Sequence, residues 1–278
     1  MKIYRKTRDV SAFVKSVKAK GKRIGFIPTM GYLHEGHLSL MRRARQETDV
    51  VVISIFVNPK QFGPKEDYRR YPRNIKKDER LARLSGVDLI FYPSVSQVYP
   101  KGYLTHIDVE GVTEGLCGVF RPGHFRGVAT VCCKLFNIVR PEIAYFGWKD
   151  AQQAIMIKRM VKDLNMDLAI KALPIVREAD GLAMSSRNKR LSSRQRKDAA
   201  VLYKALSIAR RLIREGQKSP VAITSKMGRM IKAKKGTRID YISIVDEGLA
   251  GVKRVKKGNM IALAVWFGKT RLIDNVIV

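Results

Sequence analysis

Short apolar runs alternate with amphipathic stretches through the first two thirds of the chain, and this alternation constrains the fold more than any other feature. Strands are expected at residues 24–28, 49–57, 87–92, 142–146 and 168–176, with a further short strand at 105–109. Helices are expected at residues 38–45, 75–85, 127–139 and 149–164. The run at 49–57 is continuous and rich in β-branched residues, which is typical of a parallel strand covered on both faces. The pattern predicts an α/β fold with a doubly wound parallel sheet, whose ligands bind beyond the carboxyl ends of the strands.

The pattern changes after about residue 176. Two long helices are expected at 193–215 and 220–234, and strand-like runs follow at 240–245, 260–267 and 272–278. Helices followed by consecutive strands are typical of an α+β arrangement with an antiparallel sheet. We therefore expect a larger domain at 1–176 and a smaller C-terminal α+β domain at 177–278, which begins with a connecting loop at 178–188.

The chain is strongly basic, with 55 Lys and Arg residues against 24 Asp and Glu residues and a net charge of +31. Such a charge attracts polyanions without sequence preference and also favours an anionic substrate. The basic residues are dispersed, with no dense tail and no basic strand interleaved with aromatic residues. A general surface bias therefore explains the charge better than specific nucleic-acid recognition does.

Two further features bear on location. The longest apolar run, at 50–57, is far too short to span a bilayer, and Met1 and Lys2 lead into mixed polar sequence. Three cysteines, Cys117 and the adjacent pair Cys132 and Cys133, do not make a disulfide framework. We expect a cytoplasmic protein with reduced cysteines and no membrane partner.

The stretch PTMGYLHEGH, at residues 28–37, joins the first expected strand to the helix that follows it. Its order predicts a strand, a tight glycine-containing turn and a helix N-terminus, where free N–H groups and the helix dipole favour a phosphate. His34 and His37 are three residues apart, so both imidazoles are expected on one face of the helix. Gly36 lies between them and removes a side chain where a ligand would otherwise meet a Cβ atom. Two imidazole donors at this position can stabilise charge on a phosphate during its transfer.

Two plainer explanations of the histidine pair compete with a phosphate site. A zinc site needs three or four protein ligands, but the only other histidines are His106 and His124, and the chain has no Cys-x-x-Cys pair. The two residues could also be ordinary surface or core histidines. The strand, turn and helix context favours a phosphate site over both explanations.

Other polar clusters also follow expected strands. FVNPKQF at 56–62 offers the amides of Asn58 and Gln61, and FGWKDAQQ at 146–153 places a lysine at a helix N-terminus. EADGLAMSSRN at 178–188 puts hydroxyl groups and a guanidinium on a glycine-containing loop, a combination that suits the β- and γ-phosphates of a nucleotide. RPGHF at 121–125 fits a capped turn before a helix. Each cluster alone is weak evidence, but together they predict one nucleotide site.

These blocks resemble those of the pantothenate synthetases (pantoate–β-alanine ligases), a family of the H-x-G-H nucleotidyltransferase superfamily. The resemblance runs in order through PTMGYLHEGH, FVNPKQF, YPRN with Asp78 beyond it, RPGHFRGVATV, FGWKDAQQ, VREADGLAMSSRN and RLIDN. It implies a Rossmann-like domain that binds nucleotide and pantoate, a C-terminal lid domain, and a homodimer formed through the N-terminal domain. It also implies a two-step reaction in which ATP adenylates pantoate and β-alanine then displaces AMP to give pantothenate.

The resemblance further implies roles for individual residues. The catalytic set would be His37, His34, Lys149 and Arg187, with His37 as the proton donor. The ATP-binding set would be Met30, Gly31, Tyr32, Leu33, His34, Glu35, Gly36, His37, Gly147, Trp148, Lys149, Asp150, Val176, Met184, Ser185, Ser186 and Arg187. Gln61 and Gln153 would bind pantoate, Gln61 would also bind β-alanine, and Asp78 would contact the Mg²⁺ that accompanies the phosphates of ATP.

Two other functions compete with the ligase. A sister nucleotidyltransferase would move a nucleotide to a different acceptor, although the paired glutamines and the SSRN block count against it. A basic nucleic-acid-binding protein on a nucleotide-binding scaffold would explain the charge, and its binding would depend steeply on salt. The ligase accounts for more of the chain than either alternative does, so we expect no specific nucleic-acid partner.

Overall fold

The computed structural model describes residues 1–64 and 68–278, and it divides into two compact units. The N-terminal unit comprises residues 1–109, 121–148 and 153–174, and the C-terminal unit comprises residues 110–120, 149–152 and 175–278. The longest segment of the C-terminal unit begins at residue 175, and the domain boundary expected after residue 176 stays a prediction. Two short segments group with the C-terminal unit although they come earlier in the sequence, and the functions expected of the two domains stay predictions.

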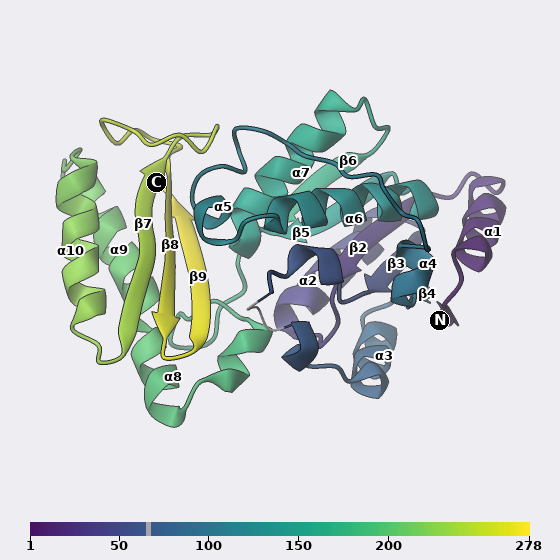
Figure 1. The fold of residues 1–278 in the computed structure, drawn as a ribbon, viewed down its shortest axis with the longest axis horizontal. Coiled ribbons are helices and arrows are strands. Elements are labelled where there is room, and N and C mark those ends of the chain that lie inside the picture. The colour runs from purple at the N-terminus through teal and green to yellow at the C-terminus, as the bar shows by residue number, and fades with distance from the viewer. Residues whose placement is uncertain (65–67) are drawn as a thin grey trace. The chain divides into compact units, whose positions relative to one another are not determined.

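The N-terminal unit is built on a six-stranded parallel sheet, as the alternating pattern predicts (Figure 1). Its strands are β1 (Lys2–Tyr4), β2 (Ile24–Thr29), β3 (Val50–Ile55), β4 (Leu89–Phe91), β5 (Ile143–Gly147) and β6 (Ala169–Leu173). They lie in the order β1-β4-β3-β2-β5-β6, and every pair is parallel. All six residues of β3 are buried, as its β-branched sequence predicts. The edge strand β1 was not expected from the sequence, because three residues are too few to show a periodicity.

Helices cover both faces of this sheet. They are α1 (Thr7–Lys18), α2 (Glu35–Glu47), α3 (Ile75–Leu84), α4 (Val95–Val98), α6 (His124–Val139) and α7 (Ala151–Asp163), whose first two residues belong to the C-terminal unit. The helices α2 and α3 lie on one face, with α6 and α7 on the other (Figure 1). Leu40, Met41 and Ala44 of α2 pack into one apolar core with Ile27 and Ile53 of the sheet.

The prediction of a strand at 105–109 is wrong. This segment runs over α6 as irregular chain, where the Ile107 N–H donates to Thr130 Oγ1 (3.0 Å) and Arg126 pairs with Asp108 (2.8 Å). Its backbone is therefore bound to side chains of a helix instead of to a neighbouring strand, and the short apolar alternation could not distinguish the two.

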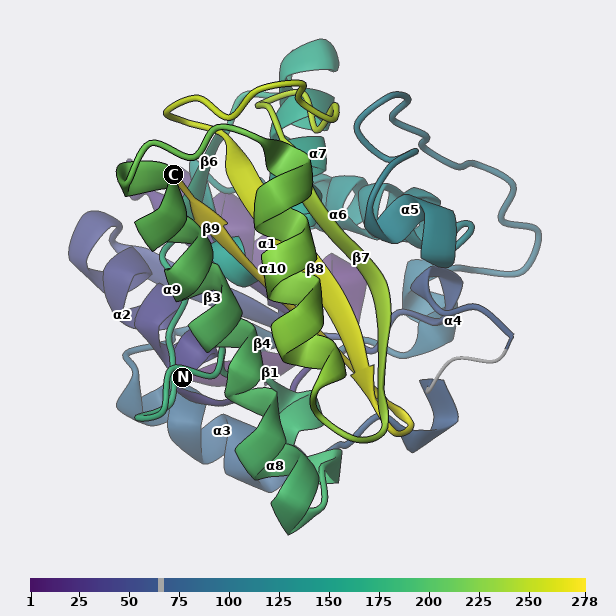
Figure 2. The ribbon, with the colours of Figure 1, turned by 90° about the vertical axis from the view of Figure 1, so that its left-hand side faces the viewer.

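The C-terminal unit has a three-stranded antiparallel sheet with helices packed on it (Figure 2). Its strands are β7 (Thr237–Val245), β8 (Met260–Phe267) and β9 (Thr270–Ile277), and its helices are α5 (Cys117–Phe120), α8 (Ser193–Ala199), α9 (Val201–Arg214) and α10 (Pro220–Lys232). The long helix expected at 193–215 is in fact two, joined through Ala200. Leu202, Leu206 and Met227 pack with Leu263 and Val265 in a separate apolar core, so the α+β arrangement is confirmed.

Two expectations from composition can be compared with this fold. Within residues 1–64 and 68–278, no helix combines the length and the apolar character needed to cross a membrane. Cys117, Cys132 and Cys133 are all free thiols, and burial raises the pKa of Cys132 to about 12, which makes this thiol a poor nucleophile.

Candidate active site

The turn after β2 is held in an unusual backbone conformation by a carboxylate from another helix. Gly31 and Tyr32 both have positive φ values, 81° and 54°, and Tyr32 therefore needs support to stay in the left-handed region. Asp78 of α3 supplies it, because its two oxygens accept hydrogen bonds from the N–H groups of Tyr32 (2.8 Å) and Leu33 (2.7 Å). Asp78 is 1% exposed. Burial raises the pKa of this carboxyl group, and the two N–H donors oppose that rise.

This geometry bears on the Mg²⁺ contact predicted for Asp78. Both of its oxygens are already engaged by the backbone of the turn, so its observed task is to fix the loop that carries the two histidines. Within the described chain, no group of three or more His, Cys, Asp or Glu side chains is arranged to hold a metal. The residues present therefore fit a metal that is carried mainly by the phosphates of a nucleotide, with few protein ligands.

His34 and His37 lie against each other at the start of α2, with ring centroids 4.1 Å apart. His34 is the N-cap residue, and its Nδ1 accepts the N–H of Gly36 (3.2 Å). The Nδ1 of His37 in turn accepts the N–H of His34 (3.3 Å). A ring nitrogen that accepts a hydrogen bond carries no proton, so the neutral form of each ring has its proton on Nε2. The cap therefore makes each imidazole an Nε2–H donor at a helix N-terminus.

Gly36 has a packing reason to be glycine. A Cβ atom at this position would lie 3.0 Å from Cε1 and Nδ1 of the His34 ring. The sequence suggested that this glycine leaves space for a ligand, but within the protein the space is needed by the neighbouring imidazole. Gly36 thus keeps His34 in its capping position.

Gln61, predicted to bind pantoate, belongs to a buried amide cluster after β3. Asn58 donates from Nδ2 to Gln61 Oε1 (3.1 Å) and to the Gly127 carbonyl (3.0 Å), while Gln61 Nε2 contacts Met30 Sδ (3.2 Å). Gln61 is 8% exposed. At Gly127 a Cβ atom would lie 2.2 Å from the Lys60 carbonyl oxygen, so α6 approaches this loop closely enough to require glycine.

Three residues that hold this cluster in place were not predicted as site residues. His124 Nδ1 lies 2.9 Å from the Gln61 carbonyl oxygen, and Arg121 NH1 lies 2.9 Å from His124 Nε2, so His124 donates from Nδ1 and accepts at Nε2. Tyr99 donates to Asn58 Oδ1 (2.9 Å), and burial raises its pKa. The block RPGHF pointed to His124 and Arg121, but Tyr99 is distant in sequence and carried no motif.

The block FGWKDAQQ joins β5 to α7 through a single turn of 3₁₀ helix at Trp148–Asp150. Within the C-terminal unit, the Lys149 ammonium lies 3.6 Å from Asp150, and the Lys149 carbonyl accepts from Asn275 Nδ2 of β9 (3.2 Å). Gln152 was not predicted, yet its buried amide fixes the segment at 110–120 through the Cys117 N–H (3.0 Å) and the Gly115 carbonyl (2.8 Å). The predicted residues Gly147, Trp148 and Gln153 belong to the N-terminal unit, and Gln153 is partly buried on α7.

The loop predicted to close over the phosphates begins as a narrow hairpin. The Met184 N–H donates to the Val176 carbonyl (2.9 Å), and Arg177 pairs with Ala183 in an antiparallel bridge. A 3₁₀ helix at Ser186–Arg190 follows, capped by Ser185, whose hydroxyl oxygen accepts the Arg187 N–H (3.3 Å). A hydroxyl group can accept and donate at once, so Ser185 can also donate through its O–H. Val176, Met184, Ser185, Ser186 and Arg187 are thus brought together within the C-terminal unit.

The predicted site residues therefore form two groups, each ordered within its own unit. In the N-terminal unit the cap of α2 places the two histidines beside Met30, Gly31, Tyr32, Leu33, Glu35 and Gly36, and the Met30 side chain links this turn to Gln61. In the C-terminal unit β9 supports Lys149 and a hairpin presents Ser185–Arg187. One group offers imidazole N–H donors at a helix end and the other offers cations and hydroxyl groups, and both kinds of donor suit phosphate oxygens.

The comparisons of this chain with known proteins agree on one family. A family model described as pantoate-beta-alanine ligase matches residues 2–277. The chain is 54% identical over 279 residues to the pantothenate synthetase of Caldicellulosiruptor bescii, a match that covers 100% of this chain and 99% of that protein. It is 56% identical over 270 residues to the pantothenate synthetase of Pelotomaculum thermopropionicum, with 97% and 96% covered.

Solved structures agree with the sequence relatives. A pantothenate synthetase from Thermus thermophilus superposes with a TM-score of 0.95 at 44% identity, covering 100% of this chain and 99% of that one. A pantoate-beta-alanine ligase from Francisella tularensis, complexed with beta-gamma ATP and beta-alanine, gives a TM-score of 0.83 at 36% identity, with 100% and 97% covered. The chain therefore belongs to the pantoate–β-alanine ligase family.

Proposed function

We propose that this member of the pantoate–β-alanine ligase family condenses pantoate with β-alanine in an ATP-dependent reaction, giving pantothenate, AMP and pyrophosphate. The observation that carries the proposal is the capped histidine pair on the turn after β2, where two Nε2–H donors are fixed at a helix N-terminus. Such donors stabilise negative charge that develops on a phosphate. Family membership over residues 2–277 supports the same activity.

The reaction needs activation because a carboxylate has no good leaving group. In the first step a pantoate carboxylate oxygen attacks the α-phosphorus of ATP, the bond to the β-phosphate oxygen breaks, and pyrophosphate leaves. In the second step the amine of β-alanine attacks the acyl carbon of pantoyl adenylate, AMP leaves with the electron pair, and the amine loses a proton. Neither step needs a covalent bond to the protein, so positioning and charge stabilisation carry the catalysis.

In this proposal the N-terminal unit supplies the donors for the transferred phosphate. His34 and His37 donate hydrogen bonds from Nε2–H to the α-phosphate and to the departing pyrophosphate. The resemblance assigns His37 as the proton donor, a role that requires the doubly protonated form of its ring. The turn at 30–37 and residues 147–148 line the ATP site, and Asp78 acts through the turn by holding Tyr32 and Leu33.

The C-terminal unit supplies the positive charge. Lys149 and Arg187 neutralise the charge that develops on the β- and γ-phosphates, and the hydroxyl groups of Ser185 and Ser186 donate to the same oxygens. Asp150 and Met184 complete this part of the nucleotide site, and Val176 contacts the adenine. Support for these assignments is the local order of the two segments, one held by Asn275 and the other by the cap on Ser185.

Gln61 and Gln153 recognise pantoate in this proposal, and Gln61 also contacts β-alanine. The support for Gln61 is its cluster: Asn58 fixes its Oε1, and His124 and Arg121 fix its main chain. A buried amide with a fixed orientation distinguishes hydroxyl from carboxylate groups of a substrate.

Mg²⁺ accompanies ATP in this proposal. Bound to the nucleotide it would lower the charge on the phosphates, and Lys149 and Arg187 are the residues that would contact the same oxygens. A direct contact from Asp78 stays a prediction. The homodimer and the cytoplasmic location are likewise proposals that rest on the family.

The experiment that tests the function is substrate-dependent pyrophosphate exchange into ATP. Purified protein with Mg²⁺ should exchange only when pantoate is present, and it should release AMP and form pantothenate only when β-alanine is added. A sister nucleotidyltransferase would exchange with another acceptor instead. Nucleic-acid binding that survives moderate salt and shows base-related selectivity, together with no exchange under any condition, would favour the binding protein.

A further inference from the structure

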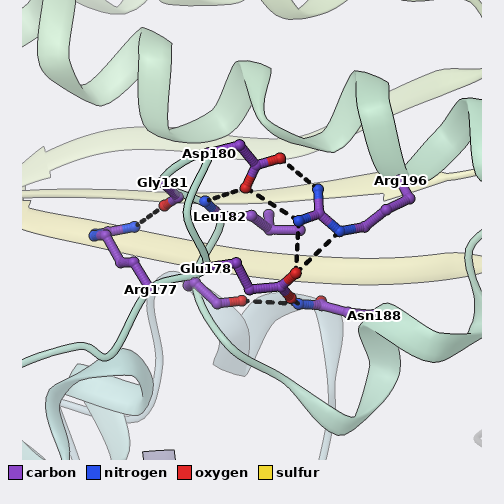
Figure 3. A network of polar contacts seen from close by, with 8 residues as sticks. Arg177, Glu178, Asp180, Gly181, Leu182, Asn188 and Arg196 are labelled. Carbon is purple, nitrogen blue, oxygen red and sulfur yellow. Dashed lines mark hydrogen bonds and ion pairs between the residues drawn. The ribbon is translucent and has the colours of Figure 1, made fainter.

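The loop at 178–188 is tied to itself and to α8 by a set of charged and amide side chains (Figure 3). The set consists of Glu178, Asp180, Asn188 and Arg196, which we call the loop frame. The first two lie at the start of the loop, Asn188 lies at its end, and Arg196 comes from α8. None of the four belongs to the residues assigned to ATP, pantoate or β-alanine above.

Arg196 joins two carboxylates at the start of the loop. It reaches Asp180 Oδ2 from NH1 (2.5 Å) and Asp180 Oδ1 from NH2 (3.1 Å), and it reaches Glu178 Oε2 from NH2 (2.5 Å) and Nε (3.2 Å). The hydrogen bond from Arg196 lowers the pKa of Asp180, and the same bond raises the pKa of the guanidinium. Charge-assisted, multidentate contacts of this kind define an orientation as well as contributing energy.

Glu178 also connects the start of the loop to its end. Its second oxygen, Oε1, accepts from Asn188 Nδ2 (2.6 Å), and the same amide group donates to the Ala183 carbonyl (3.1 Å). Asn188 is 8% exposed and directly follows Arg187. A single carboxylate therefore holds α8 with one oxygen and the residue after Arg187 with the other.

A second anchor fixes the base of the hairpin. Arg177 forms a two-pronged ion pair with Asp274 of β9 (2.7 and 2.9 Å), and its NH1 donates to the Gly181 carbonyl (2.9 Å). Gly181 itself packs on the Tyr203 ring, where a Cβ atom would lie 2.0 Å from Cδ1. The ion pair with Arg177 gives a structural role to Asp274 of the RLIDN block. No part in the reaction was assigned to Asp274.

We propose that Glu178 is a positioning residue for the phosphate step, because it holds Ser185–Arg187 in a binding geometry before ATP arrives. The inference rests on the proposed function, in which these residues contact the β- and γ-phosphates. Fixing a flexible segment costs conformational entropy, and a loop that the protein has already ordered avoids that cost when ATP binds. The order comes from the protein's own side chains.

This role has a consequence that separates it from general support of the fold. The β- and γ-phosphates take part in adenylation and leave as pyrophosphate, whereas the attack of β-alanine on pantoyl adenylate involves neither. A misplaced Ser185–Arg187 segment should therefore slow pyrophosphate exchange and spare aminolysis. A variant that merely unfolds a fraction of the protein would slow both steps equally.

The test compares Glu178→Gln with Glu215→Gln in the full chain. The Glu178→Gln change keeps the side-chain size but replaces one acceptor oxygen with an NH₂ group, which faces either Arg196 or Asn188, both of them donors. Glu215 makes an exposed pair with Arg211 at 3.7 Å and is the matched control. Pyrophosphate exchange is measured with ATP, Mg²⁺ and pantoate, and aminolysis is measured with chemically prepared pantoyl adenylate and β-alanine.

We expect exchange to fall about 100-fold in Glu178→Gln, the size expected when reacting groups are misplaced by about 1 Å. Aminolysis should stay within about twofold of wild type, as should both activities of the control. Equal losses in the two half-reactions, or no loss in exchange, would overturn the proposal. If Glu178→Gln does not fold, Arg196→Lys is measured in the same way, because one ammonium group cannot bridge both carboxylates.

Hydrogen exchange of the backbone amides tests this inference independently of the proposed function. Without any ligand, the amides of residues 183–188 should exchange slowly in wild type and in the control, and faster in Glu178→Gln. Equal exchange rates in all three proteins would refute the loop frame whatever the enzyme does. A wild-type protein with a protected loop but no pantoate-dependent exchange would instead refute the function.

Discussion

Replacing Asp78 with asparagine tests whether this residue fixes the turn at 30–37 or acts mainly on a metal. The carboxylate is 1% exposed, and its two oxygens accept the N–H groups of Tyr32 and Leu33 at 2.8 and 2.7 Å. Asparagine has nearly the same volume and keeps one acceptor oxygen. Its NH₂ group must then face one of the two N–H groups, so one buried donor loses its partner.

The expected size follows from these two hydrogen bonds. Leaving a buried N–H without a partner costs about 1–3 kcal/mol, and a hydrogen bond to a charged group contributes about 1.5–3 kcal/mol. Removing the charge offsets part of this loss, because the ionised carboxylate is itself costly to bury, as its raised pKa indicates. We expect the free energy of unfolding of Asp78→Asn to be about 2–3 kcal/mol below that of wild type.

Urea unfolding and pyrophosphate exchange measure the two effects in the same preparation. Asp163→Asn is the matched control, since Asp163 pairs with Arg159 on the exposed side of α7 (2.7 Å) and its loss should change stability by less than about 0.5 kcal/mol. In Asp78→Asn the exchange rate should fall together with stability, and excess Mg²⁺ should not restore it. An Asp78→Asn variant as stable as wild type whose activity returns with added Mg²⁺ would refute the anchoring role and support the metal contact.

Other substitutions test the remaining geometry. In Gly36→Ala the new Cβ atom displaces the His34 ring, so exchange should fall by about tenfold or more while urea unfolding changes little. Gly127→Ala should lower the free energy of unfolding by about 3 kcal/mol, because its Cβ atom meets a backbone oxygen. The control Gly228→Ala in α10 should raise the free energy of unfolding by up to about 1 kcal/mol. Unchanged stability of Gly127→Ala would contradict the close approach of α6 to the loop. The lowered pKa of Asp180 means that its contribution to stability is present above the unfolded-state pKa and is lost as pH falls through the lower folded-state value. Asp180→Asn should therefore lose less stability than wild type on acidification below about pH 4, and identical pH profiles of urea unfolding would refute this assignment.

The sequence predicted the parallel sheet because its strands are long enough to show their character. Residues 50–55 are mostly β-branched and fully buried, and the pattern alone locates β3 to within a few residues. The prediction from sequence failed where a segment is too short to show a period, or where its pattern is common to strands and irregular chain. Three residues of β1 have no measurable period, and the segment at 105–109 has a strand-like alternation although the Ile107 N–H binds a helix side chain.

In the candidate site, too, local features were predicted from the sequence and long-range contacts were not. Motif spacing predicted His34 and His37 as a pair at a helix N-terminus, because capping is a local property of the chain. It could not show that Asp78 holds Tyr32 and Leu33, since that contact joins residues about 45 positions apart. For the same reason Tyr99, which donates to Asn58 beside Gln61, and Gln152, which binds the segment at 110–120, carried no recognisable signal, since both form long-range hydrogen bonds.

The measurement that tests the central claim most directly is pyrophosphate exchange into ATP by the wild-type protein, with Mg²⁺ and at moderate salt. Exchange should depend on pantoate, and His37→Ala should abolish it without changing the urea unfolding curve. Exchange that proceeds equally without pantoate, or an active His37→Ala protein, would contradict the assignment of this site to the adenylation of pantoate.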